Sequence, residues 1–309
     1  MVYFFMSYIS DIKISNNLVL APMAKVTNLG FRLLCKKYGA GLVYSEMINS
    51  NALARGNKAT KKKSISTDRE RPVVMQIYGQ KPDLLIKAAN SLNCDIIDLN
   101  LGCPDLSVMR MGAGAALLKR PKKIYDLVKS MVDNLDKPVT AKIRTGLSKN
   151  RINAVKISRQ IEKAGACAIA VHGRNVAQKY SGKADWDIIK KVKESVNIPV
   201  IANGDIFDEE SAESCLKTTN ADFLMIGRAA IGEPYIFKRI NYFFSTGKKL
   251  EKQSISQKID DFFEYVRLSR KYGTIRYAEV KTHAQWFTKS IRKGSKIRKK
   301  LTKARNIES

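Results

Sequence analysis

Residues 96–104, IIDLNLGCP, show the pattern that decides the fold: a short apolar run ends abruptly on Gly102, Cys103 and Pro104. The same succession recurs along the chain, with an apolar β-branched run, a polar or glycine turn, and a longer stretch with helical spacing. The runs cover residues 18–21, 41–44, 73–78, 96–101, 139–143, 168–172, 199–202 and 223–226. Because they are apolar on both faces, these eight runs favour a closed parallel (β/α)8 barrel, an α/β TIM barrel, over a doubly wound sheet.

Helical spacing fills the intervals between the expected strands. The expected helices span residues 28–38, 83–92, 122–135, 154–164, 186–196 and 209–218. The polar and basic residues 51–71 predict a long surface loop. After about residue 241 the alternation stops, and apolar residues recur at spacings of three and four. We therefore expect a barrel domain over residues 1–241 and a small, basic, all-α domain over residues 242–309.

The charge balance indicates a polyanionic partner. The chain has 309 residues, with 56 Lys and Arg against 28 Asp and Glu, which gives a formal charge of +28. Such a surface favours a polyanion, and a general bias towards lysine is the alternative. Residues 286–305 hold nine basic residues and no acidic one, so they form either a solvated face or a binding face. Trp286 and Phe287 could stack on bases or belong to the core of the helical domain.

The cysteines and the apolar segments exclude several classes of protein. The five cysteines form neither a CxxC pair nor a cluster with zinc spacing, so we expect no disulfide framework, no metal site and a cytoplasmic location. Residues 1–10, MVYFFMSYIS, are apolar but lack the length of a membrane span and the basic start of a signal peptide. Because no anchor is visible, the charge favours nucleic acid over lipid as the partner.

In a barrel of this kind, the carboxyl ends of the strands form the active site. Nearly every expected strand ends on polar, cationic or glycine residues, which a purely structural barrel would not need. The residues at the eight strand ends are Pro22, Met23, Ala24, Ser45, Glu46, Met47, Gln76, Gly79, Asn100, Leu101, Gly102, Cys103, Lys142, Arg144, His172, Gly173, Arg174, Asn203, Gly204, Asp205, Gly227 and Arg228.

The last two strand ends predict a phosphate site. Asn203-Gly204-Asp205 follows the seventh strand and Gly227-Arg228 follows the eighth. Glycine lets backbone N–H groups approach an anion, and barrels often seat phosphate at these two ends. Arg228 adds a charged fork. Ordinary turns are the alternative for each dipeptide alone, but the two positions together favour a cofactor that carries phosphate.

Two cations share one face of the fifth strand, because Lys142 and Arg144 are two residues apart. Cations that point into a barrel mouth are costly unless an anionic or electron-rich group meets them. A flavin would do so, because its pyrimidine edge gathers negative charge on reduction. Gln76 could contact the same edge as donor and acceptor. The alternative for Lys142 is a side chain that reaches solvent.

His172 and Cys103 are the candidate reactive groups. His172 ends a strand and precedes a glycine and an arginine, which favours a functional role over a structural one. Cys103 lies beyond its strand, where a thiol could act as nucleophile, base or acid, whereas the other four cysteines are expected to be buried. No histidine stands near it in sequence, and Asp105 favours the protonated thiol, so we favour an acid.

With these residues assembled, the chain resembles the tRNA-dihydrouridine synthases, flavin enzymes that reduce particular uridines of tRNA. The resemblance covers most of the chain, and its motifs follow one another in the family's order. They are LAPMAKVTNLGFR, GLVYSEMI, PVVMQIYGQKP, DIIDLNLGCP, GAGAALLKRP, VTAKIRTG, VHGRNVAQKYSGKADW, IPVIANGDI, FLMIGRAAIGEPYIF and YGTIRYAEVKTHAQWF.

The resemblance implies a cofactor, FMN, and a role for each site residue. The residues implied to bind FMN are Pro22, Met23 and Ala24 along its ring, Gln76 and Lys142 at its pyrimidine side, His172 at its border, and Asn203, Gly204, Asp205, Gly227 and Arg228 at its phosphate. Asn100, Arg144 and Arg174 would bind the substrate. Cys103 would be the catalytic proton donor, with hydride supplied by NADPH or NADH. The implied partner is tRNA, with a uridine of the D-loop as target, and the implied assembly is a monomer.

Two features depart from the family's pattern, and two other functions compete with it. Asp105-Leu106-Ser107 stands where a basic residue is common after the Cys-Pro pair, and Asn175 stands where threonine is common. One competing function is an FMN barrel reductase that acts on a free pyrimidine or another small enone, which would have no use for the basic helical domain. The other is an RNA-binding protein that has lost catalysis, against which the set of Cys103, Lys142 and His172 argues.

Overall fold

Eight parallel strands close into a barrel in the computed structural model, which describes residues 7–289, 291, 294–304 and 306. They are β3 (Leu18–Leu20), β4 (Leu42–Tyr44), β6 (Val73–Tyr78), β7 (Ile96–Leu101), β8 (Val139–Arg144), β9 (Ala168–His172), β10 (Val200–Asn203) and β11 (Phe223–Ile226). The ring closes because β4 pairs with both β3 and β6. A two-residue strand, β5 (Ile48–Asn49), adds to β6. The predicted barrel is confirmed, and each predicted strand end lies within one residue of the observed one.

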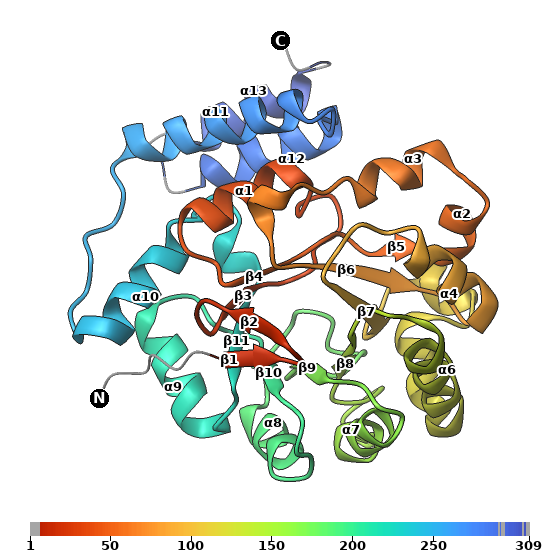
Figure 1. Ribbon diagram of the computed structural model, residues 1–309. Helices are drawn as coiled ribbons and strands as arrows, with labels where there is room; N and C mark the ends of the chain where they lie inside the picture. The colour runs from red at the N-terminus through yellow and green to blue at the C-terminus, as the bar shows by residue number, and fades with distance from the viewer. Residues whose placement is uncertain (1–6, 290, 292–293, 305, 307–309) are drawn as a thin grey trace.

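Helices surround the barrel (Figure 1). They are α1 (Leu29–Lys37), α4 (Pro82–Asn90), α6 (Pro121–Asn134), α7 (Ala154–Lys163), α8 (Trp186–Lys193), α9 (Glu209–Thr219) and α10 (Ile236–Thr246). Side-chain caps fix several of their starts: Asn28 accepts from the N–H of Phe31, and Asp185 accepts from the N–H of Ile188. All six helices expected from the sequence are present, and the largest offset is at α8, which ends three residues earlier than expected.

The two-residue period of the strands separates the barrel interior from its outer layer. On β7, Ile97 and Leu99 pack towards the helices, whereas Ile96 packs inside the barrel. A hairpin that the sequence did not predict, β1 (Ser7–Ile9) with β2 (Ile12–Ile14), lies across the amino-terminal end of the barrel (Figure 1). Its residues Ile9 and Ile14 are buried in the interior cluster. The interior is therefore closed at this end.

The expected loop over residues 51–71 is wrong in part, because four short helices interrupt it. They are α2 (Ser50–Ala54), α3 (Lys58–Lys61) and the 3₁₀ turns η1 (Lys62–Ser64) and η2 (Asp68–Glu70). The side chains of Asn49 and Asn57 cap α2 and α3. The end of the segment is held inside the protein, where Glu70 pairs with Arg32 of α1. Capping and this long-range ion pair give structure to a segment that is polar throughout.

The Arg32–Glu70 pair gives a prediction for stability. Both side chains are fully buried, with Nε to Oε2 at 2.5 Å and Nη2 to Oε1 at 3.0 Å. Glu70→Ala leaves the guanidinium buried without its carboxylate, so we expect the free energy of unfolding to fall by about 3–5 kcal/mol in urea titrations. Asp68→Ala is the control, because Asp68 is 93% exposed and its ion pair is worth at most about 1 kcal/mol. Equal losses in the two variants would contradict this account.

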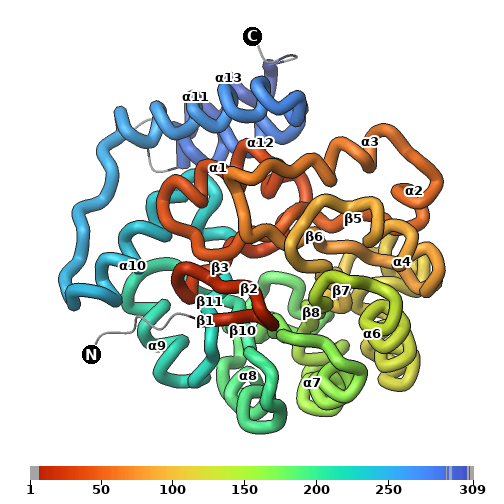
Figure 2. The backbone as a smooth tube through the Cα atoms, viewed as in Figure 1, coloured from red at the N-terminus to blue at the C-terminus, as the bar shows by residue number. Residues whose placement is uncertain are grey.

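The last three helices pack together against the barrel at α1 (Figure 1). They are α11 (Ile255–Lys271), α12 (Tyr277–Phe287) and α13 (Gly294–Lys303). The domain boundary expected after residue 241 falls inside α10, and the chain then runs along the outside from α10 to α11 through residues 247–254 (Figure 2). Phe287 is buried in the core and Trp286 is partly buried beside it. Of the basic run over residues 286–305, Arg292, Lys293 and Arg305 lie outside the described residues.

This helical domain holds the loop between β3 and α1. Asn28 donates to Glu279 at 2.7 Å and to the hydroxyl of Tyr265 at 3.1 Å. The imidazole of His283, buried in α12, lies 3.1 Å from the carbonyl oxygen of Val26. The loop that carries Pro22, Met23 and Ala24 is therefore fixed from both sides, by the barrel and by the helical domain. Among the described residues, no helix has the length and apolar character needed to cross a membrane.

Candidate active site

A cavity of about 330 Å³ opens at the carboxyl ends of the barrel strands. Of the residues to which the sequence assigned a role in binding or catalysis, all except Arg174 lie on its wall, whereas the other strand-end residues Ser45, Glu46, Gly79, Leu101 and Gly173 do not. Those on the wall are Pro22, Met23, Ala24, Gln76, Asn100, Cys103, Lys142, Arg144, His172, Asn203, Gly204, Asp205, Gly227 and Arg228. They come from strand ends spread over more than 200 positions of sequence, so the closed barrel alone brings them together.

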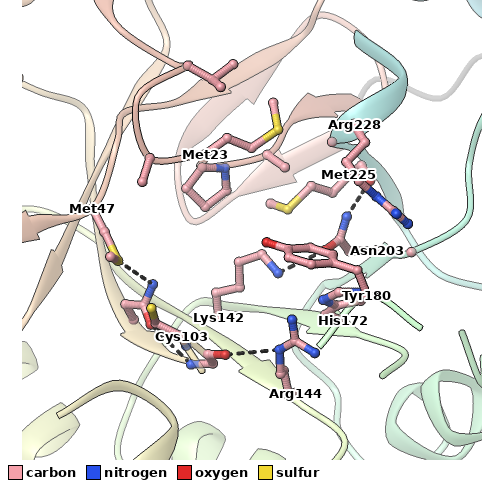
Figure 3. Close-up of a pocket in the computed structure, with 18 of the residues that line it drawn as sticks. Met23, Met47, Cys103, Lys142, Arg144, His172, Tyr180, Asn203, Met225 and Arg228 are labelled. Atoms are coloured by element: carbon pink, nitrogen blue, oxygen red, sulfur yellow. Dashed lines mark hydrogen bonds between the residues drawn. The ribbon is translucent and has the colours of Figure 1, made fainter. Parts of the chain in front are cut away.

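Lys142 extends into the middle of the cavity, with Cys103 and Met47 on one side and His172, Tyr180 and Arg228 on the other (Figure 3). Its ammonium donates to Oδ1 of Asn203 at 3.0 Å. Burial, followed by the charge of Arg144, lowers the pKa of Lys142 to about 7, and Asp98 acts in the opposite direction. The side chain points into the cavity and is partly exposed there.

The cavity carries an excess of positive charge. The guanidinium of Arg144 donates hydrogen bonds to the backbone carbonyl oxygens of Gly102, Asn175 and Lys179 at 2.8–3.1 Å. The guanidinium of Arg228 lies over the rings of Tyr180 and Phe207, at 5.2 and 5.8 Å from their centroids.

This positive charge, together with burial, affects the pKa of His172. Burial and then the charges of Lys142, Arg144, Arg174 and Arg228 hold the pKa of His172 far below its ordinary value. The imidazole is therefore neutral near pH 7. Cations gathered in one partly buried space are stabilised by an anionic ligand, so the donor set suits a group that carries phosphate and a polar ring edge.

Arg174 lies behind the cavity and holds one of its turns. Its Nη2 donates to both carboxylate oxygens of Asp205 at 2.7 and 2.9 Å and to the carbonyl oxygen of Gly182 at 2.6 Å. Asp205 in turn accepts from the N–H of Ala184 at 2.7 Å. Arg174 was expected to bind substrate, but in this structure it contacts the backbone and Asp205 and does not line the cavity.

The two turns at Gly204 and Gly227 differ in the reason why glycine occupies them. Gly204 has φ +121°, and a Cβ there would lie 2.8 Å from Cβ of Ala184 and 3.1 Å from Cδ2 of His172. Packing and backbone conformation therefore explain Gly204. A Cβ on Gly227 would meet Cβ of Ala21 at 3.7 Å and Sδ of Met23 at 3.9 Å, which are ordinary contacts. Gly227 leaves space on the cavity side, and the phosphate site stays a prediction for both turns.

Cys103 is half-buried and is held through its backbone. Its N–H donates to Oδ1 of Asn100 at 2.9 Å, and its carbonyl oxygen accepts from Ala115 at 3.1 Å. Burial raises the pKa of the Cys103 thiol, and the charge of Asp105 adds to this, whereas the backbone N–H of Asp105 and the charge of Arg144 oppose it. The thiol is therefore protonated near pH 7, as an acid requires.

The unusual residues after Pro104 form a helix cap. Asp105 accepts from the N–H of Ser107 at 2.8 Å and from its hydroxyl, at the start of α5 (Leu106–Arg110). Leu106 is exposed on this helix and does not line the cavity. The departure from the family's pattern thus has a local structural reason.

Among the lining residues to which the sequence assigned no role, three have large side chains that point to a function: Met47, Tyr180 and Phe207. Tyr180 and Phe207 are 60% and 51% exposed, and they lie in the loops after β9 and β10. Large exposed aromatic side chains at the rim of a site are a signal that can be sought in sequence, since loops after barrel strands carry function.

Comparisons with known proteins agree on one family. A family model described as dihydrouridine synthase matches residues 19–308. A probable tRNA-dihydrouridine synthase of Rickettsia conorii is 37% identical over 296 residues, which cover 94% of this chain and 89% of that protein. A tRNA-dihydrouridine synthase B of Pseudomonas syringae pv. tomato is 38% identical over 283 residues, covering 90% of this chain and 84% of that protein.

Solved structures with low identity show the same fold. A 2-naphthoyl-CoA reductase complex has a TM-score of 0.60 at 12% identity and covers 76% of this chain and 51% of its own. Histamine dehydrogenase from Rhizobium sp. 4-9 has a TM-score of 0.59 at 10% identity and covers 86% and 51%. This chain thus spans about half the length of each, and at these identities the likeness concerns the fold alone.

Proposed function

The chain belongs to the dihydrouridine synthase family, and from this premise we propose how its site works. It is a flavin-dependent oxidoreductase that forms dihydrouridine in tRNA. We take the flavin to be FMN and the hydride donor to be NADPH or NADH. One observation supports the proposal most strongly: a protonated thiol, Cys103, shares a cavity with a partly buried lysine, Lys142, and three further cationic or imidazole side chains.

The residues of the cavity fit FMN. Lys142 and Gln76 would contact the pyrimidine side of its ring, and Pro22, Met23 and Ala24 would lie along the ring. Arg228 and the turns at Gly204 and Gly227 would hold its phosphate. When bound, the flavin supplies to C6 of uracil the hydride that it takes from NADPH or NADH. His172, being neutral, would border the ring without adding a charge.

Cys103 completes the reduction of the uracil C5–C6 bond. As hydride arrives at C6, the electron pair of the double bond takes the thiol proton at C5, so the S–H bond breaks and a C5–H bond forms. The thiolate is left beside Arg144, whose charge favours it. A proton from solvent then restores the thiol. Asn100 and Arg144, both at the cavity wall, would bind the uracil.

The helical domain would bind the tRNA backbone and orient its D-loop. A reduced base must first leave its stack, which a tRNA loop allows at lower cost than a duplex. The alternative reductase of a free pyrimidine lacks support, because the relatives named for tRNA cover 90% or more of this chain. We propose a monomer in the cytoplasm. The five cysteines are all free, which suits a reducing compartment.

The identity of the cofactor can be tested on the purified protein. The purified protein is expected to be yellow and to release FMN, identified by mass, on denaturation. Anaerobic mixing with NADPH or NADH should bleach the flavin absorbance, and the ratio of the two rates gives the preferred donor. Release of FAD, or binding of no flavin by a folded protein, would contradict the proposal.

Binding of tRNA should weaken steeply with salt, because each neutralised phosphate releases counterions. For about six phosphate contacts, the affinity is expected to fall about 10³-fold between 50 and 200 mM salt. The exposed residues Lys299 and Lys300 lie on α13, so replacing both with Gln should reduce the slope of log Kd against log salt by about two. Lys122→Gln is the control: Lys122 lies on α6, a barrel helix away from the helical domain (Figure 1), so this change should leave the slope unchanged. A flat salt dependence would show that the basic helices do not bind the backbone.

A further inference from the structure

Asp98 is a fully buried carboxylate that the proposed chemistry does not use. It lies on β7, level with Gln76 of β6 and Thr140 of β8 in the register of the sheet. It does not line the cavity. A buried acid is costly unless its hydrogen bonds are satisfied, so its partners show what it does.

A chain of hydrogen bonds runs from Asp98 to the backbone of Cys103. The carboxylate accepts from Oγ1 of Thr140 at 2.7 Å and from Nε2 of Gln76 at 2.8 Å. The side-chain oxygen Oε1 of Gln76 accepts from Nδ2 of Asn100 at 2.7 Å. The side-chain oxygen Oδ1 of Asn100 accepts from the backbone N–H of Cys103 at 2.9 Å and of Gly102 at 3.2 Å.

The direction of this chain is fixed at both ends. An ionised carboxylate can only accept, so Gln76 must turn its NH₂ group towards Asp98 and its oxygen towards Asn100. The backbone N–H groups of Gly102 and Cys103 can only donate, so Asn100 must turn its oxygen towards them. Turning either amide over would place two donors or two acceptors face to face.

We propose that Asp98 is a positioning residue: through the Gln76 and Asn100 amides it fixes the backbone at Cys103 and so the place of the thiol. The inference rests on the proposed function, in which Cys103 is the acid. Asp98 does not act as the ion-pair partner of Lys142, because the ammonium of Lys142 donates to Asn203 instead.

The charge of Asp98 makes the hydrogen-bond chain from Asp98 through Gln76 and Asn100 to Cys103, called the relay below, sensitive to pH. Burial raises the pKa of Asp98 to about 6, against the opposing effects of the Gln76 and Thr140 hydrogen bonds and of the Lys142 charge. The other titratable groups facing it are Tyr44 and Cys167, whose raised pKa values keep them neutral. Below about pH 6 the carboxyl gains a proton and no longer requires the NH₂ group of Gln76. Its ionised form therefore opposes folding at neutral pH, since its pKa is higher in the folded than in the unfolded chain.

Asp98→Asn tests the proposal, because it keeps the shape and removes the constraint. We expect the single-turnover rate of uridine reduction to fall about 10–100-fold at pH 7.5, as for a misplaced reacting group, while the unfolding midpoint stays the same or rises. In the Cys103→Ala background the same change should cost no more than about threefold, because there is no thiol left to place. Wild-type rates should fall below about pH 6, and the Asp98→Asn variant should lack that acid limb.

Two outcomes would overturn the proposal. One is an equal loss from Asp98→Asn with and without Cys103. The other is an acid limb that is unchanged in Asp98→Asn. Should Asp98→Asn fail to fold, Asp98→Ser removes the same carboxylate without touching a residue of the cavity wall, and it must show the same dependence on Cys103. If Cys103→Ala alone leaves uridine reduction intact, the proposed acid fails, and that result is distinguishable from a failure of the relay.

Discussion

Cys103→Ala is expected to lower the rate of uridine reduction by about 10²–10⁴-fold, which is the usual contribution of a general acid. The loss should appear only in the half-reaction with tRNA, because reduction of the bound flavin by NADPH needs no proton from Cys103. Stopped-flow absorbance measures both half-reactions in one preparation. Reduction by NADPH is followed as bleaching of the flavin, and the half-reaction with tRNA is followed as reoxidation of the reduced flavin.

Cys167→Ala is the matched control for this prediction. Cys167 is also partly buried with a raised pKa, but it lies in the interior cluster away from the cavity. Its replacement should leave both half-reactions within about threefold of the wild-type rates. Loss of flavin from Cys103→Ala, rather than loss of the tRNA half-reaction, would show that Cys103 is a structural residue.

Lys142→Met is expected to lower the rate of flavin reduction by about 10²–10³-fold, the loss typical of removing one preorganised charged donor from developing negative charge. Methionine keeps the volume of the lysine stem and removes the ammonium that lies in the middle of the cavity. The reduction potential of the bound flavin, measured by titration against a reference dye, should fall as well, because the reduced flavin carries the negative charge that the ammonium stabilises and the oxidised flavin does not.

The pH dependence of flavin binding gives a second test of Lys142. Its pKa of about 7 before ligands bind means that the ammonium loses its proton as the pH rises through neutrality. Binding of an anionic ligand should therefore weaken above about pH 7 in the wild type, and Lys142→Met should not show this change. Lys183→Met, at an exposed position of the loop after β9, is the control. If both variants behave alike, Lys142 has no special contact with the flavin.

The barrel could be predicted from the sequence because its strands are buried on both faces. The predicted bounds of β6, β7, β9 and β11 agree with the structure to the residue, since each is a mainly apolar stretch bounded by turns. The hairpin of β1 and β2 was missed because its strands have only three residues and their burial depends on the closed barrel. The short helices between residues 50 and 70 were missed because the ion pair that holds them, Arg32 with Glu70, spans 38 positions.

Within the site, sequence indicated which residues gather but not which way each one faces. Lys142 and Arg174 both lie at strand ends, yet one enters the cavity and the other turns behind it to hold Asp205. Asp98 was counted in an apolar run, and only the register of β6, β7 and β8 shows that it lies between Gln76 and Thr140. Orientation of this kind depends on neighbouring strands, which a single sequence does not place.

The most direct test of the account is the product itself. Unmodified tRNA is incubated with the purified protein, FMN and NADPH, and dihydrouridine is mapped by mass spectrometry of nuclease fragments. We expect a mass increase of two hydrogens at a specific uridine, in the D-loop, for the wild type, and at most a trace for Cys103→Ala. Absence of dihydrouridine from every fragment, with a protein that is folded, yellow and reduced by NADPH, would contradict the central claim.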